Sequence, residues 1–249
     1  MKKISVPFVF IMLSISSMAQ TDNWYFSFNM GASWPSGTFG QTNINDKSSG
    51  YAQQGFSLLL DATYPLTSHW GLKGLTLINT NTIDHNGMES MLKGRIDPSI
   101  AVTNPDFLSY TANPWMWNAL LGGPVFTVSI GRIYWDLQLL GGFNLTYLPQ
   151  QKLQYNDPVL KWYYSDKNTT STNLSWGILG GTAFRFPISE RVNLKLGIDY
   201  YLSNATIKYQ QTRVSQSAES VVTEVLGSGS DLIPIKMLTG TIGFVYYLN

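Results

Sequence analysis

The 249-residue sequence contains no cysteine and few charged residues. Without thiols the chain cannot form disulfide bonds, thiolate metal sites, a cysteine nucleophile or a lipidated cysteine anchor. Asp, Glu, Lys and Arg make up 12% of the residues, about half the ~25% typical of a soluble domain. The formal net charge is +1, so the composition excludes the strongly basic surface that binds nucleic acid.

The sequence also lacks long apolar runs after its N-terminus. A spanning helix needs ~20 mostly apolar residues, and no later stretch approaches that length. At the N-terminus, Lys2 and Lys3 precede an apolar run over residues 4–15 and a small residue, Ala19. This pattern predicts a secretory signal peptide, residues 1–19, in preference to a retained membrane helix, which would be longer. Residues 20–249 then form one domain.

Aromatic residues are plentiful, at 14% of the chain, and the chain also contains 22 glycines. Residues 236–249 show how they are arranged, because large apolar side chains such as Phe244 and Tyr246 alternate with smaller or more polar ones. A period of two over this length indicates a β-strand with two different environments. Seven earlier segments repeat the pattern, so the predicted strands are residues 23–34, 55–64, 70–81, 115–128, 132–147, 174–186, 191–203 and 236–249.

The connections between these segments alternate in length. The long ones are residues 35–54, 82–114, 149–173 and 204–234, and the short ones are residues 65–69, 129–131 and 187–190. Such asymmetry is typical of an antiparallel up-and-down barrel with short periplasmic turns and long extracellular loops. We therefore predict an all-β, eight-stranded transmembrane β-barrel with four long loops, closed by pairing of residues 240–247 with residues 23–34. A soluble β-sandwich would not require this alternation.

Aromatic residues gather near the predicted strand ends, where amphipathic rings favour the membrane interface. We expect one belt at the short-turn end and a second at the long-loop end. The second belt is expected to include Trp34, Trp115, Trp117, Tyr147, Trp176, Tyr200 and Tyr201.

On this pattern of strands and connections, the chain resembles the small outer-membrane β-barrel proteins of Gram-negative bacteria, the OmpA-like or porin-family eight-stranded type. The resemblance covers residues 23–249. It implies location in the outer membrane, contact with outer-membrane lipid and lipopolysaccharide, and recognition of the last strand by the barrel-assembly machinery. Phe244, Tyr246 and Leu248 fit the alternation of that last strand, whereas Asn249 departs from the usual terminal aromatic residue.

Charged residues within the predicted strands fall almost entirely on the inward face. A charge that faces lipid costs about 2–4 kcal/mol near the bilayer midplane, so the interior is the expected place. We predict a balanced lumen ion-pair network of three acids and three bases. Its members are Asp61, Lys73, Asp136, Arg185, Lys195 and Asp199. The network either fills the lumen structurally, as we favour, or provides an ion or proton path.

The third long connection combines aromatic and basic side chains that could recognise a glycan, a lipopolysaccharide headgroup or a protein. The candidates are Tyr155, Lys161, Trp162, Tyr163 and Tyr164. The alternative, to which we give equal weight, is that residues 162–164 extend a strand pair beyond the membrane and pack on its neighbours.

Catalytic signals are weak. His85 has Asp84, Glu89 and Ser90 nearby, but no motif marks a nucleophile, and the spacing does not specify a metal site. We therefore predict no enzyme activity, no cofactor and no metal. The favoured function is a filled outer-membrane barrel with a structural or surface-interaction role, in contact with a surface ligand or an envelope protein. The alternatives are a narrow channel or small-solute transport barrel and an outer-leaflet lipid-modifying enzyme.

Overall fold

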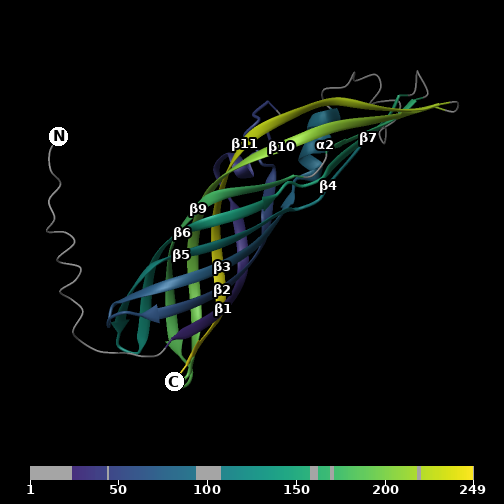
Figure 1. The fold of residues 1–249 in the computed structure, drawn as a ribbon. Helices are drawn as coiled ribbons and strands as arrows, with labels where there is room; N and C mark the ends of the chain where they lie inside the picture. The colour runs from purple at the N-terminus through teal and green to yellow at the C-terminus, as the bar shows by residue number, and fades with distance from the viewer. Residues whose placement is uncertain are drawn as a thin grey trace, which may run out of the picture.

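The structure is a computed structural model that describes residues 24–43, 45–93, 108–157, 162–168, 171–217 and 220–248. The predicted signal peptide lies outside these residues. Eight antiparallel strands form a closed ring (Figure 1). They are β1 (Tyr25–Pro35), β2 (Ala52–Pro65), β3 (Trp70–Ile83), β5 (Trp115–Ile130), β6 (Ile133–Tyr147), β9 (Thr172–Pro187), β10 (Val192–Gln216) and β11 (Val221–Tyr247). The predicted all-β, eight-stranded up-and-down barrel is confirmed.

The ring closes where the first strand meets the last. β1 pairs with β11 from Tyr25 opposite Tyr247 to Pro35 opposite Met237, which matches the predicted antiparallel pairing. β11 also pairs with β10 along its other edge, from Val192 opposite Tyr246 onward. The barrel wall therefore presents no unpaired strand edge between these strands, as a spanning sheet requires.

The two faces of the barrel wall differ as the alternation predicts. On β1, Phe26, Phe28 and Met30 are 43–46% exposed on the outside, whereas Ser27 and Asn29 are buried inside. Every other strand of the ring carries outward apolar side chains of the same kind, including Phe56, Leu60, Leu72, Ile78, Leu120, Leu137, Leu139, Phe143, Ile178, Leu196, Ile198, Leu202, Ile242 and Phe244. A continuous apolar surface of this extent is stable against lipid and not against water, so the barrel is a transmembrane one.

The ends of the barrel differ in their connections. At one end β2 joins β3 through residues 66–69, β5 joins β6 through residues 131–132, and β9 joins β10 through residues 188–191. Gly131 adopts a φ of +63°, a left-handed conformation that suits the two-residue turn. The C-terminus lies at this short-turn end (Figure 1). Neither helical segment among the described residues, η1 (Gly37–Gly40) or α2 (His85–Lys93), is long and apolar enough to cross a bilayer.

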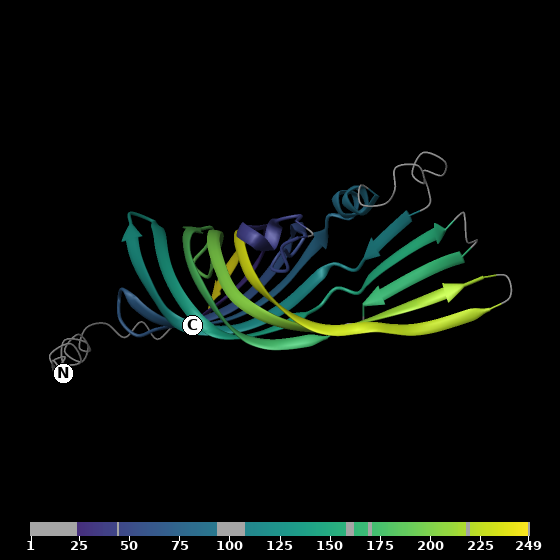
Figure 2. The same ribbon diagram turned by 90° about the horizontal axis from the view of Figure 1, so that it is seen from above.

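At the other end, much of what was expected to be loop is sheet. β10 and β11 continue past the ring and pair up to Gln216 opposite Val221, and β8 (Trp162–Asn168), β7 (Gln151–Asp157) and β4 (Leu108–Ala112) add to their edge. We call residues 206–216 and 221–232 with these three strands the paddle, which projects beyond the barrel body (Figure 1, Figure 2). At ~3.3 Å per residue its hairpin reaches about 35–40 Å. Most of residues 204–234, which were predicted as a long connection, therefore continue β10 and β11 as strand.

Close approach of β1 and β11 gives a direct test of ring closure. A Cβ added at Gly31 would collide with the backbone carbonyl of Gly240 on β11, whereas one added at Gly74 on β3 would meet open space on the outer face. We expect Gly31→Ala to destabilise the barrel by about 1–3 kcal/mol through overpacking. Gly74→Ala should change stability by less than about 0.5 kcal/mol. Urea unfolding in lipid vesicles measures both, and equal stabilities would contradict the β1–β11 register.

Candidate functional site

The six charged side chains predicted to face the lumen all lie inside the barrel and are at most 5% exposed. Each occupies an inward position because successive side chains on a strand point to opposite faces, and its neighbours in sequence face the lipid. The structure divides them into two groups at different depths, which the sequence did not separate. The members are Asp61, Lys73, Lys195 and Asp199 in the first group and Asp136 and Arg185 in the second.

The first group centres on the carboxylate of Asp61. Its Oδ2 atom lies 2.8 Å from Lys195 Nζ, and its Oδ1 atom lies 3.6 Å from Lys73 Nζ. Ser27 also donates a hydrogen bond to Oδ2, and Asn29 Nδ2 donates another over 3.1 Å. One carboxylate thus serves two ammonium groups, which reduces the cost of burying all three charges.

Asp199 joins this group through an amide rather than through a direct ion pair. Lys73 Nζ donates to Gln138 Oε1 over 2.7 Å, and Gln138 Nε2 donates to Asp199 Oδ1. The Gln138 amide therefore bridges the Lys73 ammonium and the Asp199 carboxylate by one hydrogen bond to each. Asp61 and Asp199 together balance Lys73 and Lys195, so the group carries no net charge.

The second group lies at the short-turn rim. Arg185 Nε lies 2.7 Å from Asp136 Oδ2 in an ion pair, and Arg185 Nη2 donates a hydrogen bond to Asp136 Oδ1 over 2.8 Å. The guanidinium also donates to the Tyr247 hydroxyl and lies 4.6 Å from the ring centroid of Tyr25 and 5.0 Å from that of Tyr134. These contacts hold the arginine by charge, hydrogen bonding and cation–π attraction together.

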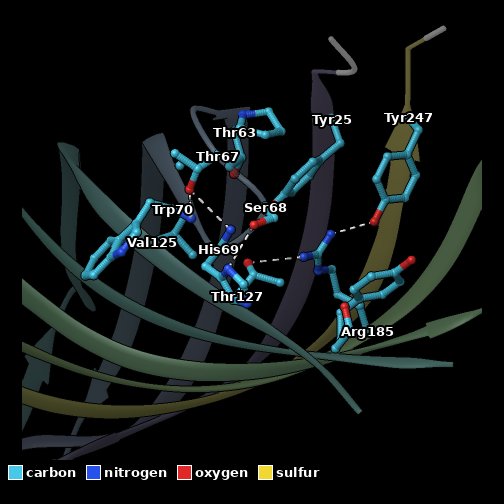
Figure 3. A pocket seen from close by; sticks show the side chains of 14 residues that line it. Tyr25, Thr63, Thr67, Ser68, His69, Trp70, Val125, Thr127, Arg185 and Tyr247 are labelled. Atoms are coloured by element: carbon cyan, nitrogen blue, oxygen red, sulfur yellow. Dashed lines mark hydrogen bonds between the residues drawn. The ribbon is translucent and has the colours of Figure 1, made fainter. Parts of the chain in front are cut away.

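A cavity of about 320 Å³ opens at this rim (Figure 3). Arg185, Tyr25 and Tyr247 form one side of it, and the β2–β3 turn with Ser68 and His69 forms another. Because the Arg185 guanidinium is already engaged by Asp136 and Tyr247, the cavity presents hydroxyl groups and ring edges rather than a free cation.

Above the charged groups the interior contains a buried apolar cluster, which the sequence reasoning missed. Inward-facing leucines from five different strands join in one buried cluster, each at most 3% exposed: Leu59, Leu75, Leu77, Leu121, Leu140 and Leu179. The signal was present on β3, where Leu75 and Leu77 follow Lys73 at inward positions. An alternating segment with leucines on its polar face indicates an apolar layer of the lumen.

The long-loop mouth is occupied by the β1–β2 connection. Phe39, in η1, is fully buried, and its ring centroid lies 5.6 Å from those of both Trp115 and Trp117 in edge-on geometry. Trp115 Nε1 donates to the carbonyl of Gly50 over 2.7 Å, which ties the connection to β5. Trp115, Trp117 and the 1%-exposed Tyr201 were expected in the aromatic belt and instead belong to the interior.

The predicted recognition residues of the third connection lie in the paddle. Tyr155 of β7 stacks on Tyr164 of β8 at 4.7 Å, and the guanidinium of Arg213 covers both rings while making a 2.7 Å bidentate pair with Asp166. The hydrogen bonds that Arg213 donates to Asp166 raise the pKa of the guanidinium. Lys161 lies outside the described residues. The backbone begins β8 at Trp162, and Tyr163 is half-buried.

The residues around His85 are used locally. Asp84 Oδ1 accepts from the backbone N–H of Gly87 at the start of α2, and Glu89 pairs with Lys93 over 2.8 Å one turn along the same helix. His85 itself packs against the ring of Tyr110. Across the described ranges, no three His, Asp or Glu side chains converge in a way that could hold a metal ion.

Comparison with known proteins gives likeness of fold. No protein family matches the sequence, and no curated protein matches it. Among solved structures, the chain is similar to a major outer membrane protein of Thermus thermophilus (13% identity, TM-score 0.46, 90% of this chain and 99% of that one). It is also similar to Ail, the attachment invasion locus protein of Yersinia pestis (12%, 0.38, 90% and 98%), and to OprG of Pseudomonas aeruginosa (12%, 0.37, 91% and 96%). The expected resemblance to small outer-membrane β-barrels is confirmed.

Lys195 offers a test of the buried charges. Lys195→Met removes the ammonium closest to Asp61 and should destabilise the barrel by about 3–5 kcal/mol, because the carboxylate loses its better partner in a buried site. The matched control is Lys93→Met, which breaks the half-exposed pair with Glu89 and should cost about 0.3–0.5 kcal/mol. Urea unfolding in vesicles compares them. Similar losses for both variants would argue that the interior pair contributes no more than a surface one.

Proposed function

We propose that the protein is an integral outer-membrane barrel with a sealed interior that acts as a structural scaffold for a surface-interaction module, the paddle. The observation that carries the proposal is the continuous filling of the interior. Charged pairs occupy the short-turn half, leucines occupy the next level, and Phe39 closes the mouth against Trp115 and Trp117. An eight-stranded barrel encloses only enough space for such side chains.

The location follows from the outer surface and from the fold class. The apolar band would contact the acyl chains of outer-membrane lipid, and lipopolysaccharide would surround the long-loop end. Trp34, Tyr147 and Tyr200 are 37–43% exposed at that end and are placed to meet the headgroup level. Assembly would depend on export and on the barrel-assembly machinery, which recognises the last strand in this class.

The paddle supplies the interaction surface. It continues the hydrogen-bonded ladder of β10 and β11, so it is held at a defined angle to the barrel instead of hanging from a flexible loop. Rigid elements of this kind are suited to present recognition residues to a partner. A rigid projection of this kind favours a surface ligand or an envelope protein as partner.

A transport role is the second candidate, and one feature favours it. A cavity of about 750 Å³ opens at the upper ends of β5, β6 and β9 and is lined by Met116, Tyr147 and Leu148 among others. It would suit a small apolar solute. Met116 and Tyr147 are 48% and 37% exposed on the outward face of the wall, so the cavity opens outside the barrel and provides no aqueous path through it. An outer-leaflet lipid-modifying enzyme has less support, because Asp84 and Glu89 serve α2.

Conductance across planar bilayers tests the sealed interior. We expect no steady nanosiemens-scale steps from the purified barrel. The double variant Phe39→Ala/Trp117→Ala should stay silent too, because the leucine layer lies between the mouth and the charged groups. A known open porin in the same bilayer serves as the positive control. Steady steps from the unmodified protein would overturn the sealed interior and favour the channel alternative.

Antibody access to intact cells tests the orientation of the paddle. An epitope tag inserted after Ser217, at the paddle tip, should be detected on whole cells. The same tag inserted after Glu190, in the β9–β10 turn, should be detected only after the outer membrane is permeabilised. Both insertions lie in exposed connections and should leave the ring intact. Surface labelling of the Glu190 insertion alone would show the opposite orientation and exclude contact through the paddle.

A further inference from the structure

A small pocket lies where the mouth meets the root of the paddle, and it belongs to neither the charged groups nor the leucine layer. Its volume is about 210 Å³, below the ~300–1,000 Å³ of drug-sized sites, so it would hold one small ligand. We call it the mouth pocket. Its lining comes from the β1–β2 connection, β5, β7, β8, β10, β11 and the residue after β6, Leu148.

The lining combines apolar and polar groups. Trp115, Leu148 and Ile233 are at most 9% exposed and supply an apolar part of the wall. The polar groups come from separate elements: a carboxylate from the β1–β2 connection, another from β11, and amides from β7, β8 and β10. A ligand with one apolar face and a polar edge would satisfy both parts of the lining.

Backbone strain marks one wall of the mouth pocket. Tyr51 has a φ of +53°, the left-handed region that an aromatic residue adopts only at a cost. It is held there from both sides, because its N–H donates to the carbonyl of Gln41 and its own carbonyl accepts from the N–H of Asp84. Its hydroxyl donates to the carbonyl of Asn43 over 2.9 Å. The surrounding structure thus fixes this ring beside the pocket.

An unsatisfied hydroxyl provides an independent sign of a ligand. Ser49 is 3% exposed, lines the mouth pocket, and its Oγ atom has no hydrogen-bond partner within the described structure. A buried hydroxyl without a partner is destabilising, because it has given up its hydrogen bonds to water. A bound molecule with its own hydroxyl groups would provide the missing hydrogen bond.

The polar lining discriminates between classes of ligand. Asp46 and Asp231 face the pocket against a single cation, Lys47, so an anion would be repelled. A simple cation would leave the amide N–H groups of Gln151, Asn168 and Gln211 without acceptors. Hydroxyl groups both donate to carboxylates and accept from amides, so a neutral polyhydroxylated ligand uses the whole set.

We propose that the mouth pocket binds a neutral sugar unit of a surface polysaccharide, with its C–H face against the apolar wall and its hydroxyls on Asp231, Gln211 and Ser49. The inference rests on the proposed surface-interaction function. It names the class of ligand that binds at the long-loop end of the barrel. The pocket is formed partly by the paddle root, so binding would couple the ligand to both the barrel and the paddle.

Ligand-observed saturation-transfer NMR on the full-length protein in lipid nanodiscs tests this assignment. The probes are the methyl glycosides of glucose, galactose, mannose and N-acetylglucosamine, with N-acetylneuraminic acid as an anionic comparison. We expect millimolar or tighter binding of at least one neutral glycoside and no transfer to the anionic sugar. Asp231→Ala should weaken binding at least tenfold, the loss typical of a hydrogen bond to a charged group, and Gln211→Ala, which removes an exposed neutral amide, should weaken it about two- to tenfold.

Matched controls lie on the same two strands. Glu224→Ala on β11 and Gln216→Ala on β10 remove the same chemical groups away from the pocket and should leave binding unchanged. Heat-modifiable migration on gels confirms that each variant still forms the ring. No binding of any neutral glycoside, preference for the anionic sugar, or equal losses in the control variants would each overturn the assignment. A sealed barrel with an exposed paddle and no sugar binding would refute the sugar site alone, whereas steady conductance would refute the proposed function instead.

Discussion

The pairing of β1 with β11 is the constraint on which the rest of the structure depends. Backbone N–H and C=O groups have no water to bond within a bilayer, and an open sheet edge there would cost several kcal/mol for each unpaired group. Closing the edge with eight strands fixes a narrow interior. Closure also determines which side chains face lipid and which face the lumen, and every side chain that faces the lumen must fit within that narrow space. The buried ions, the leucine layer and the folded-in connection are all solutions to this one packing problem.

The interior solves the problem differently at its two ends. Near the short turns the side chains are charged, and each charge has a partner within the barrel or an amide that links it to one, as with Gln138 between Lys73 and Asp199. Towards the mouth, buried leucines and tryptophans share the interior with neutral polar side chains that bond to one another, as Asn81 does to Ser33 and Asn144 to Thr146. Apolar burial and hydrogen bonds between neutral groups therefore fill the upper half, whereas ion pairing fills the lower half.

The spanning strands could be predicted from the sequence because lipid imposes a strict outward pattern, as on β1, where Phe26 and Phe28 alternate with Ser27 and Asn29. The same logic placed the six charges inside but could not assign partners, which depend on register and shear. Trp115 and Trp117 were misplaced because an aromatic residue near a strand end suits a lipid interface and a plugged mouth equally well. The alternative that residues 162–164 extend a strand pair anticipated β7 and β8 of the paddle. The extension of β10 and β11 was missed because these strands are exposed to water there, so residues such as Gln210 and Ser228 carry no apolar period.

The paddle and the mouth pocket follow from the same ladder that closes the ring. β10 and β11 run without a break from the lipid-embedded wall into the paddle, so Asp231 and Gln211 are positioned by strands whose lower halves are clamped in the bilayer. Tyr51 and Ser49 approach from the opposite side on a connection that Phe39 and Trp115 anchor in the lumen. A site built between two such anchored elements needs little reordering when a ligand binds, which lowers the entropic cost of recognition. The proposed sealed lumen and the proposed sugar site would thus share one arrangement, because Phe39 and Trp115, which pack in the mouth, also hold the connection that lines the pocket.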